Sequence, residues 1–111
     1  MNWINFNSEV QLENLVQKSF QVPQVIFKHS TRCGTSRMVL NRLERNQLPT
    51  EIDFYFLDVI VYRNISNKIA EQFQIYHESP QLIIIKNGEC VFDESHFGIN
   101  SHVLIQQISS L

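Results

Sequence analysis

The sequence has few of the residues that build disulfide scaffolds, linkers or membrane spans. Its 111 residues include only two cysteines, three glycines and three prolines. Two cysteines are too few for the disulfide framework of a small secreted domain. There are no repeats, linkers or low-complexity stretches, and no apolar run approaches the roughly 20 residues that cross a bilayer. These absences leave a globular domain with reduced thiols.

The charge balance excludes a further class of partner. The net charge is −2, and the nine lysines and arginines are scattered along the chain, which argues against nucleic acid or an anionic membrane as the main partner. Residues 1–6 have neither a basic start nor a sustained apolar segment, so we expect no signal peptide. With 43% hydrophobic residues and eight phenylalanines, we expect one domain over residues 1–111, cytoplasmic and monomeric, with a continuous core.

Hydrophobic periodicity predicts alternating strands and helices. A capping-box pattern, Ser8 with Gln11, indicates a helix near the start of the chain. Asn87-Gly88 between two apolar runs is the strongest short-range signal for a hairpin. The predicted elements are a helix over 8–20, a strand at 25–27, a helix over 34–46, a strand at 54–59, a helix over 64–73, hairpin strands at 82–85 and 90–92, and a last helix from residue 101.

This order of elements predicts the fold class. Two strands joined by a helix should lie parallel through a right-handed crossover. The hairpin adds two strands that are antiparallel to each other. The result is an α/β, thioredoxin-like fold, with a mixed four-stranded sheet flanked by helices and an extra N-terminal helix.

The candidate nucleophile is Cys33, which falls between the first predicted strand and the helix that follows it. A thiol at a helix N-terminus faces unpaired backbone N–H groups and the positive end of the helix dipole, and both favour the thiolate. Open α/β sheets place their sites at this end of the strands. In the sequence Cys33-Gly34-Thr35-Ser36, a serine stands where a second cysteine could have been. We therefore predict redox chemistry with one thiol, and a hydrogen bond from Ser36 to the thiolate.

Ser79-Pro80 stands immediately before the 82–85 strand. Proline has no N–H to give to a sheet, so it is tolerated at a strand start. In a thioredoxin-like sheet this position lies beside the nucleophilic cysteine. We predict a cis peptide here, with the Ser79 backbone turned toward an extended substrate segment that pairs with it.

Three segments carry a resemblance to a known family. Residues 28–33 (Lys-His-Ser-Thr-Arg-Cys), 77–81 (His-Glu-Ser-Pro-Gln) and 86–89 (Lys-Asn-Gly-Glu) resemble the YtxJ-like monothiol bacilliredoxins, and the similarity covers nearly the whole chain. These are small thioredoxin-fold proteins of bacteria that use bacillithiol in place of glutathione. The resemblance implies that Cys33 attacks a mixed disulfide between bacillithiol and a client protein, releases the client thiol and takes the bacillithiol.

The resemblance also implies the partners. They are bacillithiolated client proteins, bacillithiol as a low-molecular-weight co-substrate, and a second thiol or a disulfide reductase that frees Cys33; no cofactor stays bound. The sequence departs from the family pattern at Gly34, where the family usually has proline. Proline suits the first helical turn, whereas Gly34 leaves an extra N–H donor near the sulfur. Lys28 and Arg32 could add positive charge there or hold a ligand carboxylate.

The other thiol and the histidines carry weaker signals. Cys90 follows the Asn87-Gly88 turn, about 17 Å along the strand from Pro80, which is too far for a disulfide with Cys33. His29, Cys33 and His77 give three possible ligands where structural zinc takes four, so we predict no metal site.

Two other functions stay open. Cys33-Gly34-Thr35-Ser36 is similar to the Cys-Gly-Phe-Ser of monothiol glutaredoxins that carry an iron–sulfur cluster. Those proteins hold glutathione with a Gly-Gly-x-Asp segment after the hairpin, and residues 91–96 contain no glycine pair. The second alternative is a non-catalytic thioredoxin-like adaptor whose Cys33 senses oxidation.

Overall fold

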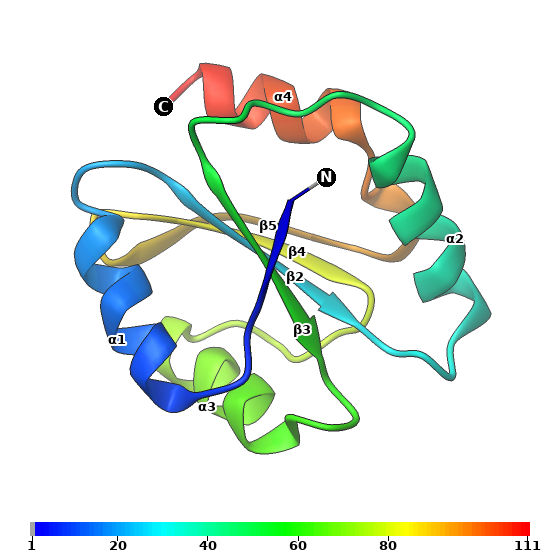
Figure 1. The fold of residues 1–111 in the computed structure, drawn as a ribbon, viewed down its shortest axis with the longest axis horizontal. Helices are drawn as coiled ribbons and strands as arrows, with labels where there is room; N and C mark the ends of the chain where they lie inside the picture. Colours follow the sequence, from blue (N-terminus) through cyan, green and yellow to red (C-terminus); the bar gives the residue numbers. More distant parts are fainter. Residues whose placement is uncertain (1) are drawn as a thin grey trace.

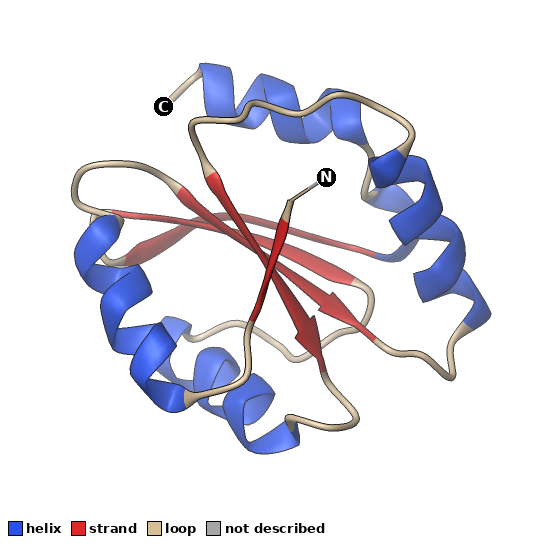
Figure 2. Ribbon diagram, viewed as in Figure 1, coloured by secondary structure: helices blue, strands red, loops and turns tan. Residues whose placement is uncertain are grey.

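The computed structural model describes residues 2–111, in which one mixed sheet separates two pairs of helices (Figures 1 and 2). The sheet has five strands in the order β1-β3-β2-β4-β5. None of the helices within residues 2–111 is long and apolar enough to cross a bilayer. The elements are β1 (Trp3–Asn5), α1 (Glu9–Lys18), β2 (Gln24–His29), α2 (Gly34–Glu44), β3 (Asp53–Asp58), α3 (Arg63–Phe73), β4 (Gln81–Lys86), β5 (Glu89–Ser95), the 3₁₀ turn η1 (His96–Gly98) and α4 (Ser101–Ser109).

The thioredoxin-like class and the extra N-terminal helix are confirmed, but the strand count of four is wrong. Trp3–Asn5 forms a fifth strand that pairs in parallel with β3, with Trp3 opposite Phe54. It covers backbone groups of β3 that would otherwise form an exposed sheet edge. The Trp3 ring packs 5.8 Å from the ring of Phe27 and 5.7 Å from that of Phe56, between centroids. Three residues are too few to show the alternation by which a strand is recognised.

The core has two layers, one on each face of the sheet, because successive side chains of a strand point to opposite faces. Helices α1 and α3 cover one face and α2 and α4 the other (Figure 1). Leu12, Leu15, Ile65 and Ile69 pack on the first face, and Val39, Leu43 and Leu104 on the second. Every residue of β2 is buried, as its apolar run predicts for a strand covered on both faces.

Helix α1 begins as predicted and ends early. The side-chain oxygen of Gln11 accepts a hydrogen bond from the backbone N–H of Ser8 at 3.0 Å, as in a capping box. The helix ends at Lys18, so Phe20, which the spacing places on its apolar face, lies beyond it with 58% of its surface exposed.

The strand register brings four connections to one end of the sheet. Parallel strands β2 and β3 finish together, with His29 opposite Asp58. Antiparallel β4 begins at the same end, with Gln81 opposite Lys28, and Ser95 at the end of β5 lies opposite Gln81. The segments 30–33, 59–62 and 75–80 and the turn η1 therefore meet there. We refer to this as the carboxyl end of β2.

Candidate active site

Cys33 is the residue at which α2 begins. It is the N-cap, with an extended backbone at φ −104° and ψ 119°. Its carbonyl accepts the first helical hydrogen bond, from the N–H of Arg37 at 3.2 Å, and its own N–H donates to the carbonyl of Ser30 at 3.2 Å. The free thiol is partly exposed. The predicted placement is confirmed: a partly exposed thiol stands at the N-terminus of an 11-residue helix.

Gly34 is the first residue inside α2, and the structure does not require a glycine there. A Cβ atom at this position would meet only the guanidinium of Arg37, at an ordinary contact distance of 4.0 Å. The other end nitrogen of that guanidinium donates to the carbonyl of Thr31 at 3.0 Å. Arg37 therefore bridges the turn that carries Cys33, a role that the sequence reading missed.

Replacing Gly34 with proline, the residue usual in the family that the sequence resembles, is expected to preserve the fold. Cys33 already has the extended backbone that a residue before proline must adopt, and the first N–H of a helix has no intrahelical partner to lose. The gain should be about 0.4–1 kcal/mol in the free energy of unfolding, because the unfolded chain is restricted. Urea unfolding measures it, with Gly34→Ala as the matched control. A lower urea midpoint for the proline variant than for wild type would contradict the conclusion that the backbone at this position accommodates proline.

Ser36, which occupies the position of a second cysteine, is completely buried. Its hydroxyl oxygen accepts a hydrogen bond from the N–H of Ser30 at 3.1 Å and lies 2.7 Å from Nδ1 of His29. The sequence predicted a bond to the Cys33 thiolate, whereas these two partners tie the hydroxyl to the end of β2. Burial lowers the pKa of His29, more than Asp58 raises it, so this histidine is neutral at neutral pH.

Ser36→Ala is expected to destabilise the protein by about 1–3 kcal/mol, because Ser30 N–H and the buried His29 nitrogen both lose their partner. Thermal unfolding measures the loss. Thr35→Ala, one residue earlier in the same turn, is the control for helix propensity. An unchanged midpoint in Ser36→Ala would show that water replaces the hydroxyl without cost.

The Ser79–Pro80 peptide bond is cis, as predicted. Pro80 is buried at the start of β4, and its carbonyl accepts a hydrogen bond from the N–H of His96 at 3.1 Å. Gln81 lies opposite Lys28, near the end of β2. Because β4 runs antiparallel to β2, Ser79 and Pro80, which precede Gln81, lie at the carboxyl end of β2, where the Cys33 turn begins.

The two cations singled out by the sequence have different positions. Arg32 is exposed in the turn before Cys33 and stays a predicted ligand contact. Lys28 has no exposed surface, so it cannot hold a carboxylate in solvent as the sequence suggested. Its ammonium donates to the carbonyl of Ser66 at 3.1 Å and lies 3.4 Å from Nδ1 of His77. Burial lowers the pKa of Lys28 to about 8.

Cys90 stands at the opposite end of the sheet. It pairs with Ile85, which in turn pairs with Gln24 at the start of β2. Both cysteines are free, as the predicted separation requires. Burial raises the pKa of the Cys90 thiol, with a smaller contribution from Asp93. Across residues 2–111, no three His, Cys, Asp or Glu side chains are grouped so that they could hold a metal ion.

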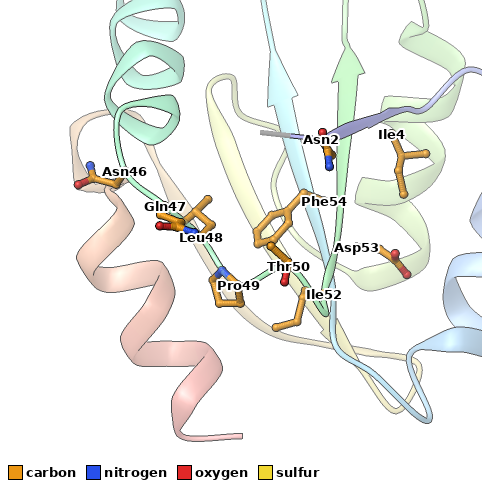
Figure 3. A pocket seen from close by; sticks show the side chains of 10 residues that line it. All are labelled: Asn2, Ile4, Asn46, Gln47, Leu48, Pro49, Thr50, Ile52, Asp53 and Phe54. Carbon is orange, nitrogen blue, oxygen red and sulfur yellow. The ribbon is translucent and has the colours of Figure 1, made fainter.

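The structure has a pocket of about 390 Å³, and Figure 3 shows the side chains that line it. Its lining comes from the connection between α2 and β3, residues 46–50, and from the starts of β1 and β3. Because β2 and β3 are parallel, the start of β3 is the end of the sheet remote from the thiol. This pocket therefore lies at the other end of the sheet from Cys33.

Known proteins agree with this arrangement. The family model "Monothiol bacilliredoxin BrxC" matches residues 4–104. A solved structure with a thioredoxin fold is 30% identical, with a TM-score of 0.81 over 93% of this chain and 90% of its own. Thioredoxin of Schistosoma mansoni, at 21% identity, has a TM-score of 0.73 over 99% and 95% of the two chains. Thioredoxin of Fasciola hepatica, also at 21%, has a TM-score of 0.71 over 96% of each. With its single thiol at the start of α2, the chain belongs to the monothiol bacilliredoxin family and has a thiol redox function.

Proposed function

We propose that this protein removes bacillithiol from mixed disulfides of client proteins, using Cys33 as the nucleophile. The observation that carries the proposal is a partly exposed thiol at the N-cap of α2, with a buried serine in place of a second cysteine. Family membership supports bacillithiol as the low-molecular-weight thiol. We further propose that it acts as a cytoplasmic monomer, with bacillithiol as co-substrate and no bound cofactor.

The first step is a thiol–disulfide exchange. The Cys33 thiolate attacks the bacillithiol sulfur of the mixed disulfide, and the bond between that sulfur and the client sulfur breaks. The client leaves as a thiolate and takes a proton from water, while a disulfide between Cys33 and bacillithiol forms. No electrons are gained or lost overall, since one disulfide replaces another.

The second step needs a thiol from outside the chain. Ser36 has no sulfur, and Cys90 lies at the far end of the sheet. A second thiolate, from free bacillithiol or a disulfide reductase, attacks the bacillithiol sulfur of the adduct and releases the Cys33 thiolate. With bacillithiol as the attacking thiol, the product is bacillithiol disulfide.

Groups around the thiol would bind the two parts of the substrate. The exposed guanidinium of Arg32 is suited to a carboxylate of the low-molecular-weight thiol. The N–H of Gly34, in the first turn of α2, would be a further donor near the sulfur. The Ser79 backbone, before the cis proline, would pair with an extended client segment.

The test is a comparison of two adducts of one client protein. Reduced protein is mixed with the client carrying either bacillithiol or glutathione, and intact masses are recorded over time. We expect the bacillithiolated client to lose its adduct faster. Loss of both adducts at equal rates would support thiol–disulfide exchange but contradict a preference for bacillithiol. A client that keeps both adducts, with the protein folded, would refute the proposed function.

A further inference from the structure

A polar cluster joins the segment 75–80, which leads to the cis proline, to β2 and α3, and the proposed chemistry does not use it. It contains Lys28 from β2, Ser66 from α3 and His77 from the segment itself. The ammonium of Lys28 lies 3.1 Å from the Ser66 carbonyl and 3.4 Å from Nδ1 of His77. The Ser66 hydroxyl lies 3.0 Å from the same nitrogen. The Lys28 ammonium from β2 and the Ser66 hydroxyl from α3 therefore both contact Nδ1 of His77.

Contact with an ammonium favours one protonation state of His77. An ammonium offers only donors, and a fully buried one is costly unless acceptors surround it. To accept from Lys28, Nδ1 of His77 must carry no hydrogen, so the ring is neutral with its proton on Nε2. Desolvation lowers the pKa of His77, and the charges of Lys28 and Arg63 lower it further.

We propose that Lys28 and His77 are positioning residues, whose contact holds the segment 75–80 against the sheet and so fixes the Ser79 backbone beside Cys33. The inference rests on the proposed function, in which the client pairs with Ser79. His77 lies two residues before Ser79, and the contact joins this segment to the strand that ends at the Cys33 turn. The segment has other ties, from Gln81 to the Tyr76 carbonyl at 2.9 Å and from the His96 ring to Glu78 at 3.0 Å. Of these side-chain contacts, only that with Lys28 reaches β2.

Protonation of His77 would break this contact. The groups that face its ring are Lys28 from β2, Arg63 and Ser66 from α3, and Glu78 from the segment itself, whose charge favours the protonated ring. A proton on Nδ1 would set two donors, both positively charged, against each other. We therefore expect the segment to loosen, and transfer to slow, as the pH falls below the ordinary histidine value of about 6.5.

Variants of His77 separate positioning from general stability. His77→Leu keeps the bulk without an acceptor and should slow transfer about fivefold at neutral pH, the effect of one lost hydrogen bond. His77→Asn keeps an acceptor that does not titrate, so it should restore most of the rate and flatten the profile on the acid side. His102→Asn, at an exposed histidine of α4, is the control. Alkylation of Cys33 by iodoacetamide at each pH corrects for the thiolate fraction.

Two measurements test the contact without any transfer reaction. In Lys28→Met, NMR titration should show a raised pKa of His77, and amide hydrogen exchange at residues 76–79 should be faster than in wild type. Unchanged His77 titration and exchange would overturn the inference, as would a His77→Asn variant as slow as His77→Leu. Absence of transfer in wild type would refute the proposed function instead, and the NMR and exchange results would still decide whether Lys28 holds the segment.

Discussion

Replacing Cys33 with serine is expected to abolish release of the client thiol, whereas Cys90→Ser keeps the wild-type rate. A serine hydroxyl does not ionise near neutral pH and cannot form the mixed disulfide, so the rate should fall by at least about a thousandfold. The Cys90 thiol stands at the other end of the sheet and is kept protonated by burial, which raises its pKa. Release is measured as free client thiol over time.

The pair of cysteine variants makes the result specific. Both substitutions exchange one atom in a partly exposed side chain, so both proteins should unfold near the wild-type midpoint. Retained release in Cys33→Ser would contradict the one-thiol mechanism. Loss of release in a folded Cys90→Ser variant would show that Cys90 takes part in the exchange, and this would contradict the one-thiol mechanism as well.

The second large effect concerns stability, and it comes from Lys28. Its pKa is about 8 in the folded protein and 10.5 in the ordinary, solvated state. Between these values the unfolded chain binds more protons than the folded one, so raising the pH stabilises the wild type there. This increase in the free energy of unfolding is at most ~3 kcal/mol. Below pH 8 the full cost of burying the cation is present.

Lys28→Met is expected to remove that cost and the pH dependence with it. Methionine has a similar unbranched shape and no charge. The Ser66 carbonyl, inside α3, has its helical partner, and the Ser66 hydroxyl still bonds His77, so no buried polar group is left unpaired. We expect a higher urea midpoint than wild type at pH 7 and a smaller rise from pH 8 to 10.

The control is Lys68→Met, because Lys68 is an exposed lysine of α3. This variant should keep the wild-type pH dependence of stability. Cys90 and Tyr55, whose pKa values are raised by burial, act in the opposite direction at high pH but are common to all three proteins. A lower midpoint for Lys28→Met at pH 7, with the wild-type pH dependence kept, would contradict this assignment.

The features that the sequence predicted best depend on local chemistry. Cys33 at a helix start and Pro80 at a strand start follow from backbone rules that involve only a few neighbours. The strand register then brings both to one end of the sheet. Strand β1 was missed because three residues carry no period, and its pairing with β3 spans about half the chain.

The role of Lys28 could not be predicted in this way. Its partners, Ser66 and His77, are 38 and 49 residues away in the sequence, and lysine is almost never fully buried unless it is paired. A weak signal existed, because Lys28 directly continues the apolar run of a strand covered on both faces. The partners of Ser36 were also missed. They are His29 and Ser30, at the end of β2, and only the folded turn brings them against the first turn of α2.

The most direct test of the central claim is to locate the adduct. Reduced protein is mixed with an equimolar bacillithiolated client, quenched with acid within the first turnover, digested without reductant and mapped by mass spectrometry. We expect one bacillithiol, on the peptide that contains Cys33, and an unmodified Cys90 peptide. Bacillithiol on Cys90, or a client freed of its adduct with none on Cys33 at any time, would contradict it.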